Sequence, residues 1–205
     1  MKYNLKPDFP IDNATSKKET GKTLDEWFAE FDAMDGLKKG RRALSVYLNE
    51  AGVDPWWCNT ISVEYEAARD VRKKDGLLEG YFICATKTIG APLADTYRKF
   101  TSPEGLAAWM GEGTRAEIKD GGSLTGPDGE KATLTRVREN KDLRLSFEHP
   151  DFTAPSVIDV QFHDKAGKKT MVYILHQRLQ TKAEADGVRE AWGEACDRLK
   201  KLIEG

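Results

Sequence analysis

A long amphipathic helix at the C-terminal end of the sequence constrains the fold more than any other segment. Thr181-Lys-Ala-Glu184 has the pattern of a capping box, which marks the first residues of a helix. The apolar residues that follow recur every three or four positions, as on a helix with a wide buried stripe. These residues are Val188, Ala191, Trp192, Ala195, Leu199, Leu202 and Ile203. Because several short strands precede this helix, we expect it to lie across a sheet and to enclose a pocket with it.

Composition excludes two classes of partner. The chain has 205 residues, 39% hydrophobic and 32% charged, and a net charge of −2 with acids and bases interspersed. Such a balance provides no basic surface of the kind that binds nucleic acid or an anionic membrane. No apolar run approaches the roughly 20 residues of a membrane-spanning helix. The first residues also lack the apolar core of a signal peptide, so we expect a cytoplasmic protein.

The sequence shows no metal or cofactor motif. Cys58, Cys84 and Cys196 are odd in number and widely separated, which favours free buried thiols. No Cys-x-x-Cys pair and no cluster of cysteine with histidine is present. The tripeptide 21–23, Gly-Lys-Thr, lacks the earlier glycine and the preceding strand that a phosphate-binding loop requires. We therefore expect neither a metal nor a cofactor.

Residues 1–75 have the pattern of a small all-helical domain. Helices are expected at 13–20, from the capping box at 23–26, at 41–50, and after Asp54-Pro55. The last of these has apolar residues nearly all round, among them Trp56 and Trp57. A helix with two apolar faces is buried between neighbours or contacts another domain. The charged, glycine-ended stretch 69–80 places a domain boundary before residue 80.

From residue 80 the hydrophobic period changes from helical spacing to alternation. Leu143, Leu145 and Phe147 alternate with polar residues, as in a strand with one dry and one wet face. Strands are expected at 81–89, 115–119, 133–137, 143–148, 157–163 and 169–178, with short helices at 91–99 and after Ser102-Pro103. Residues 80–205 therefore predict an α+β domain, with an antiparallel sheet followed by the long helix.

Several segments carry a family resemblance. They are Thr88-Ile-Gly-Ala-Pro92, Phe100 to Trp109, Gly121-Gly122-Ser123, the last strand up to His176, and Trp192 with Leu199-Lys-Lys-Leu202. In their order they resemble the START-like helix-grip superfamily (SRPBCC), and within it the branch related to the activator of the heat-shock-protein-90 ATPase. That resemblance implies a curved antiparallel sheet, two short helices and a long C-terminal helix around a hydrophobic cavity. Residues 20–27 and 54–57 resemble a helical domain of unknown function that precedes helix-grip domains in bacteria.

The resemblance places aromatic side chains around the expected cavity. The candidate ligand-binding residues are Tyr97, Trp109, Phe147, Phe162, Ile174, His176 and Trp192. On the last strand, alternation puts His176 on the same face as Ile174, where it would bond a polar ligand group or act as a base. The alternative is a histidine at the rim, satisfied by backbone or water. Asp159 and Glu148 fall on the wet faces of their strands, so we expect no catalytic carboxylate pair.

The opposite face of the last strand carries Met171, Tyr173 and Leu175, where polar residues are usual. An exposed apolar patch generally marks a contact. We expect the N-terminal helical domain or a partner subunit to cover this strand, with Trp56 or Trp57 as candidates to meet it.

Two classes of function follow, and a third is disfavoured. The first is non-catalytic binding of a small apolar or amphipathic ligand in the cavity. The second is a protein-interaction or co-chaperone-like module. An enzyme of the cyclase or hydrolase kind needs polar groups in the pocket that the sequence does not supply. The cavity volume separates the first two: an empty cavity on the order of several hundred Å³ favours a ligand, and one filled by Trp109 and Trp192 favours interaction.

Overall fold

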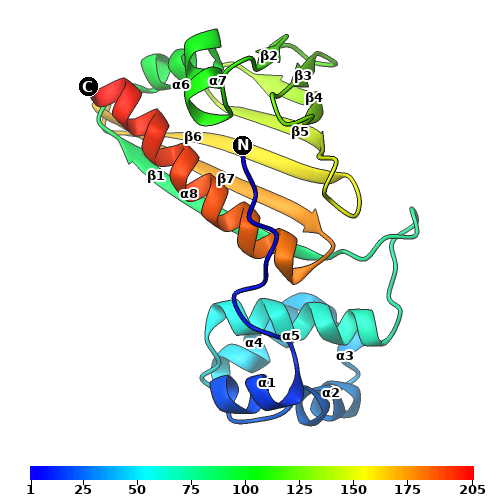
Figure 1. Cartoon of the computed structure of the whole chain (residues 1–205). Helices are drawn as coiled ribbons and strands as arrows, with labels where there is room; N and C mark the ends of the chain where they lie inside the picture. The colour runs from blue at the N-terminus through cyan, green and yellow to red at the C-terminus, as the bar shows by residue number, and fades with distance from the viewer. The chain divides into compact units, whose positions relative to one another are not determined.

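The computed structural model describes residues 1–205 and divides into two compact units (Figure 1). The helical unit comprises residues 7–81, and the grip unit comprises residues 82–205 together with residues 1–6. The α+β fold class expected from the sequence is confirmed. The first six residues differ from expectation, since they belong with the sheet and not with the helices. Burial of Met1, which is 3% exposed, accounts for this placement.

Five helices form the helical unit. They are α1 (Asn13–Thr20), α2 (Leu24–Ala33), α3 (Gly36–Lys39), α4 (Arg41–Glu50) and α5 (Pro55–Ala68). The expected capping box is present at the start of α2, where Thr23 and Glu26 exchange hydrogen bonds with each other's backbone N–H. Gly21 ends α1 with a positive φ of 83°, as the sequence predicted. The short helix α3 was not predicted, because four residues carry too little periodicity.

An aromatic cluster forms the core of the helical unit. Phe31 and Tyr65 meet edge to face at 5.1 Å between ring centroids, and Trp57 stacks on Phe9 at 5.2 Å. The hydroxyl of Tyr65 donates to Asp32 at 2.7 Å, which satisfies the polar end of a buried ring. Trp57 is thus part of this unit's own core, whereas Trp56 is half-buried.

The grip unit contains a seven-stranded sheet in the order β1-β7-β6-β5-β4-β3-β2. Its strands are β1 (Tyr81–Ile89), β2 (Arg115–Ala116), β3 (Ser123–Thr125), β4 (Lys131–Arg138), β5 (Asp142–Glu148), β6 (Ser156–Lys165) and β7 (Lys169–Leu179). Strands β2 to β7 pair with their neighbours antiparallel. The sequence predicted all of them except β3, which is three residues long and lies directly after the turn at 121–122.

Three helices complete the grip unit: α6 (Leu93–Thr101), α7 (Pro103–Trp109) and α8 (Lys182–Glu204). Helix α8 lies across one face of the sheet, and residues 1–6 run beside it (Figure 1). The capping box at Thr181 is present. The predicted apolar stripe is buried over its first five members, Val188, Ala191, Trp192, Ala195 and Leu199. We call the face under α8 the inner face of the sheet and the opposite one the outer face.

The outer face carries a network of ion pairs that the sequence did not reveal. Asp159 was placed on a wet face, but it is only 5% exposed. Its carboxylate accepts from Arg144 at 2.7 Å and from Arg136 at 3.1 Å. The long arginine side chains cover the carboxylate and pair with it, since a buried charge requires partners. Glu148 is exposed, as predicted.

Candidate functional site

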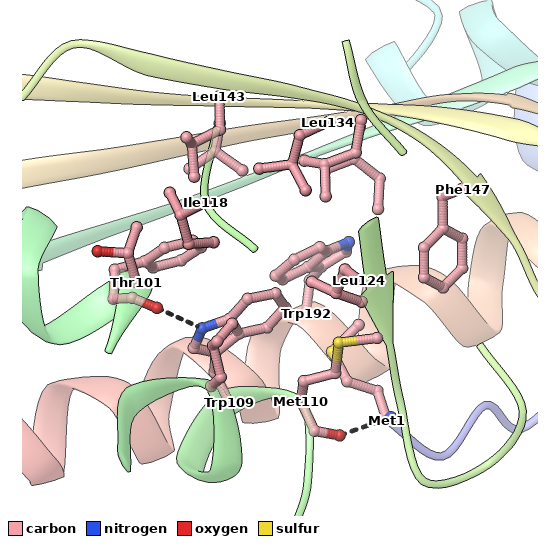
Figure 2. A pocket seen from close by; sticks show the side chains of 15 residues that line it. Met1, Thr101, Trp109, Met110, Ile118, Leu124, Leu134, Leu143, Phe147 and Trp192 are labelled. Carbon is pink, nitrogen blue, oxygen red and sulfur yellow. Dashed lines mark hydrogen bonds between the residues drawn. The ribbon is translucent and has the colours of Figure 1, made fainter. Parts of the chain in front are cut away.

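The inner face, α6, α7, α8 and residue 1 enclose an apolar cavity (Figure 2). Fifteen residues line it, and Thr101 is the one among them with a polar side chain. The free volume is about 20 Å³, which is close to the space of a single water molecule. In this state the cavity holds no room for a ligand, because its own side chains fill it.

Stacked aromatic rings account for much of that filling. Trp109 lies between Phe100, at 4.8 Å between centroids, and Trp192, at 5.5 Å, with both pairs nearly parallel. The indole N–H of Trp109 donates to the carbonyl of Phe100 at 2.9 Å (Figure 2). Ser102 caps α7 by accepting from the N–H of Gly105 at 3.0 Å, which sets the direction of the helix that carries Trp109.

The structure brings three of the seven predicted site residues to the cavity wall: Trp109, Phe147 and Trp192. The other four do not line it. Phe162 packs beside the wall, at 5.3 Å from the ring of Phe100. Tyr97 contacts Phe162 and lines a separate open groove of about 330 Å³.

Ile174 and His176 on β7 do lie on the inner face, but they are completely buried there and do not reach the cavity. The alternation that placed them on this face was therefore correct. What it could not show is that other side chains separate them from the cavity.

His176 is part of a chain of buried hydrogen bonds that runs from the indole of Trp192 to the carbonyl of Phe147. The indole N–H of Trp192 donates to Nδ1 at 3.2 Å, so Nε2 carries the proton and donates to Ser156 Oγ at 2.8 Å. The Ser156 hydroxyl in turn donates to the carbonyl of Phe147 at 3.3 Å. Burial lowers the pKa of His176 to about 3, so the ring is neutral at physiological pH. The histidine is neither at a rim nor positioned as a base.

Met1 is a wall residue that sequence patterns did not identify. Its α-ammonium group donates to the carbonyl of Met110 at 2.7 Å (Figure 2). The same group forms a buried ion pair with Glu130, and the Asp128 carboxylate lies 3.7 Å away. No periodicity signals such a contact, because it joins residues more than a hundred positions apart. Ile118, two residues after β2, and Leu124, in the three-residue strand β3, also line the cavity and were not identified, because such short elements show little alternation.

The outer face of β7 and β1 carries an apolar strip, which we call the outer strip. It consists of Phe82, Cys84, Met171, Tyr173 and Leu175. Phe82 is 40% exposed, and the three β7 residues are half-buried. Cys84 is exposed, so the expected buried thiol is wrong for this cysteine, whereas Cys58 and Cys196 are buried. The thiol of Cys84 and the hydroxyl of Tyr173 are 3.2 Å apart, which confirms that the strands present these residues on one face. This hydrogen bond, together with burial, raises the pKa of Tyr173 to about 12.

Two kinds of feature are absent from the structure. None of its helices combines the length and the apolar character needed to cross a bilayer. No group of three or more histidine, cysteine, aspartate or glutamate side chains is arranged to hold a metal ion.

Comparison with solved structures identifies the fold of the grip unit. An HSP90 activator from Plasmodium falciparum matches with a TM-score of 0.55 at 15% identity, over 62% of this chain and 97% of the other. The Aha1 dimer from Colwellia psychrerythraea matches with a TM-score of 0.53 at 18% identity, over 60% and 96%. CalU16 from Micromonospora echinospora gives 0.54 at 17% identity, over 60% and 74%. At these identities the likeness shows the fold alone.

Sequence comparison goes further for the same unit. No curated protein matches the chain. The family model described as "Activator of Hsp90 ATPase homolog 1-like protein" matches residues 90–204, which is more than half of the chain and spans α6 to α8. The predicted helix-grip resemblance is thereby confirmed, and the chain belongs to the family of activator of Hsp90 ATPase homolog 1-like proteins.

Proposed function

We propose that this protein is a non-catalytic interaction module that binds an Hsp90-type ATPase through the outer strip. The observation that carries the proposal is the outer strip itself, an apolar surface on β1 and β7 where a solvated sheet face is ordinarily polar. The kind of partner follows from family membership and from the similar fold of an HSP90 activator.

The filled cavity supports interaction over ligand storage. A carrier site for a drug-sized molecule encloses about 300–1,000 Å³, whereas this one has about 20 Å³ free. The stacked rings of Trp109 and Trp192 fill the place where a ligand would lie. A small apolar or amphipathic ligand would therefore have to displace part of the wall before it could bind.

The polar groups of the inner face argue against an enzyme. A general base is most effective when its pKa lies near the working pH and when it reaches the substrate. The pKa of His176 is lowered to about 3, and both ring nitrogens are engaged by Trp192 and Ser156. His176 is therefore not available as an acid–base group in the cavity.

The surroundings of the outer strip fit a protein interface. Next to it on the same face lies the charged network in which Asp142 and Asp159 pair with arginines. Burial alone would raise the pKa of Asp142, but hydrogen bonds from Arg138 and Arg136 outweigh it and lower that pKa. The carboxylate therefore stays charged. An apolar centre beside a charged border is the usual anatomy of protein–protein interfaces.

Titration with an Hsp90-type chaperone, read by calorimetry and by stimulation of its ATPase, tests the proposal. The double substitution Met171→Glu with Tyr173→Glu should weaken binding by more than about tenfold, because a charge would be buried at the centre of the contact. Thr133→Glu is the matched control, since Thr133 is exposed on the outer face of β4. Absence of binding, or equal loss in both variants, would refute the proposal.

A further inference from the structure

One wall of the apolar cavity comes from a segment that is not part of the helix-grip fold. Residues 1–6 run as an extended chain beside α8, without helix or strand. Alternate side chains point inward: Met1 is buried, Tyr3 and Leu5 are half-buried, and the residues between them are exposed. In Figure 2 the side chain of Met1 lies beside Met110 and Leu124, where it closes the cavity.

Beyond the contacts of the Met1 ammonium, this segment is held by few directional contacts. The backbone N–H of Lys6 donates to the carbonyl of Asn4 at 2.8 Å, so this hydrogen bond lies within the segment itself. The ring of Tyr3 packs against His149 at 4.9 Å and Phe152 at 5.0 Å, but its buried hydroxyl has no hydrogen-bond partner. Apart from the anchored Met1 ammonium, the segment is docked by side chains and leaves one polar group unsatisfied, so its residues 2–6 are suited to reversible release.

Helix α8 is shaped to admit the segment. Gly187 lies inside the helix, where glycine is unfavourable. A Cβ atom at this position would lie 2.6 Å from the carbonyl oxygen of Asn4, so an alanine and the docked segment exclude each other. Gly193, also within α8, would meet nothing within 4 Å. Gly187 therefore contacts the segment and Gly193 does not, although both lie within α8.

The buried end of the segment shows the chemistry of the site. Glu130 is 1% exposed, and its carboxylate accepts from the N–H of Asp128 at 2.8 Å and pairs with the ammonium of Met1. A buried carboxylate left without a cation is strongly disfavoured. Whatever replaces the segment must therefore supply an ammonium group to Glu130 and an apolar body to the cavity.

We propose that residues 1–6 are an internal ligand of a binding site for apolar amines, formed by Glu130, the Met110 carbonyl and the cavity wall. The site opens when the segment leaves. A ligand that competes with an internal occupant binds with an apparent affinity reduced by the fraction of molecules that are open. The intact protein therefore binds such amines weakly, and any change that releases the segment strengthens binding. This inference does not depend on a chaperone partner.

Binding of n-hexylamine to the full-length protein tests the proposal, followed through the indole N–H resonances of Trp109 and Trp192. Gly187→Ala should bind hexylamine at least about tenfold more tightly than the parent protein, because it removes the competing segment. Gly193→Ala, with the same change in helix propensity, should bind like the parent. Equal affinity in all three proteins would overturn the proposal.

A second comparison tests the role of the carboxylate. With Gly187→Ala present, hexylamine should bind at least about tenfold more tightly than 1-hexanol, because only the amine replaces the ion pair with Glu130. Adding Glu130→Gln should abolish that preference. Equal binding of the amine and the alcohol before this change would overturn the assignment of an amine site.

The parent protein provides a test that needs no variant. Saturating hexylamine should displace residues 1–6 and make them accessible to an added protease. Should Gly187→Ala fail to fold, this measurement decides the matter. Unchanged resistance of the segment to the protease at saturation would overturn the proposal.

Discussion

The two faces of the sheet bury polar groups in opposite ways. On the inner face, His176 is neutral and fully enclosed, and its hydrogen bonds run through Trp192 and Ser156. On the outer face, Asp159 is almost as buried, but it is paired with Arg136 and Arg144, which are about 40% exposed. The inner face keeps its buried histidine uncharged, and the outer face pairs its buried aspartate with arginines.

The difference follows from what covers each face. Trp192 of α8 covers His176 together with the rings of Phe147 and Phe152, and in such surroundings the charged form of a titratable group is destabilised. The arginines that cover Asp159 keep part of their side chains in water, so their charges retain solvation while they pair with the carboxylate. The inner face should therefore respond to lost volume and to pH, and the outer face to lost charge and to salt.

The largest effect should come from truncation on the inner face. Trp192→Ala should lower the free energy of unfolding by about 3–5 kcal/mol, because Trp192 is 1% exposed and stacks on Trp109. Urea unfolding measures the loss. Trp192→Phe, which keeps an aromatic ring but loses the N–H to His176, is the control and should cost less. A loss below about 2 kcal/mol for the alanine variant would mean that the residue lines open space and not packed core.

Charge removal on the outer face should rank second. Asp159→Asn should cost about 1.5–3 kcal/mol, because hydrogen bonds to charged groups are in this range. The cost should shrink in about 1 M salt, where screening acts over about 3 Å. Asp151, with its side chain 74% exposed, offers the control Asp151→Asn, for which the change should be within about 0.5 kcal/mol. Equal costs for the two variants would show that the network contributes nothing.

The stability of the protein should depend on pH through the buried His176 on the inner face. The folded-state pKa of His176 is lowered to about 3 from an ordinary 6.5, so below pH 6.5 the unfolded chain binds a proton that the folded chain does not. Stability should therefore fall as the pH decreases from 6.5 toward 3, by up to about 1.4 kcal/mol per unit. His176→Gln should flatten the slope between pH 6.5 and 5, whereas His163→Gln, at an exposed position, should leave it unchanged. Parallel slopes for all three proteins would contradict this account.

Local signals account for what the sequence predicted well. The capping boxes at Thr23 and Thr181 predicted where α2 and α8 begin, because the bonds involved join residues three positions apart. Helical spacing likewise placed Trp109 and Trp192 on buried faces, and both line the cavity. Features that depend on a few neighbouring residues were predictable in this chain.

What the sequence did not predict depends on distant side chains. The volume left between Trp109 and Trp192 is a matter of rotamers and packing, which no periodicity encodes. Asp159 alternates like a solvent-facing residue, and only the arrangement of arginines on two other strands buries it. The resemblance implied a cavity, but it did not show that Met1 helps to fill it.

The smallest change in stability is expected at Tyr3, whose buried hydroxyl, unlike the ring nitrogens of His176, has no hydrogen-bond partner. Its hydroxyl is buried without a hydrogen-bond partner, and burial, with nearby Glu130 and Asp128, raises its pKa well above 10. Tyr3→Phe should therefore stabilise the protein, by up to about 1 kcal/mol, since it removes an unsatisfied polar group and keeps the ring.

The matched control is Tyr173→Phe, because the Tyr173 hydroxyl is bonded to Cys84 and its loss should be neutral or destabilising. Thermal unfolding of the two variants, compared with the parent, gives the sign of each change. Because Tyr3→Phe strengthens docking of residues 1–6, it should also weaken hexylamine binding, opposite to Gly187→Ala. Destabilisation by Tyr3→Phe would show that the Tyr3 hydroxyl is satisfied after all, as the ring nitrogens of His176 are.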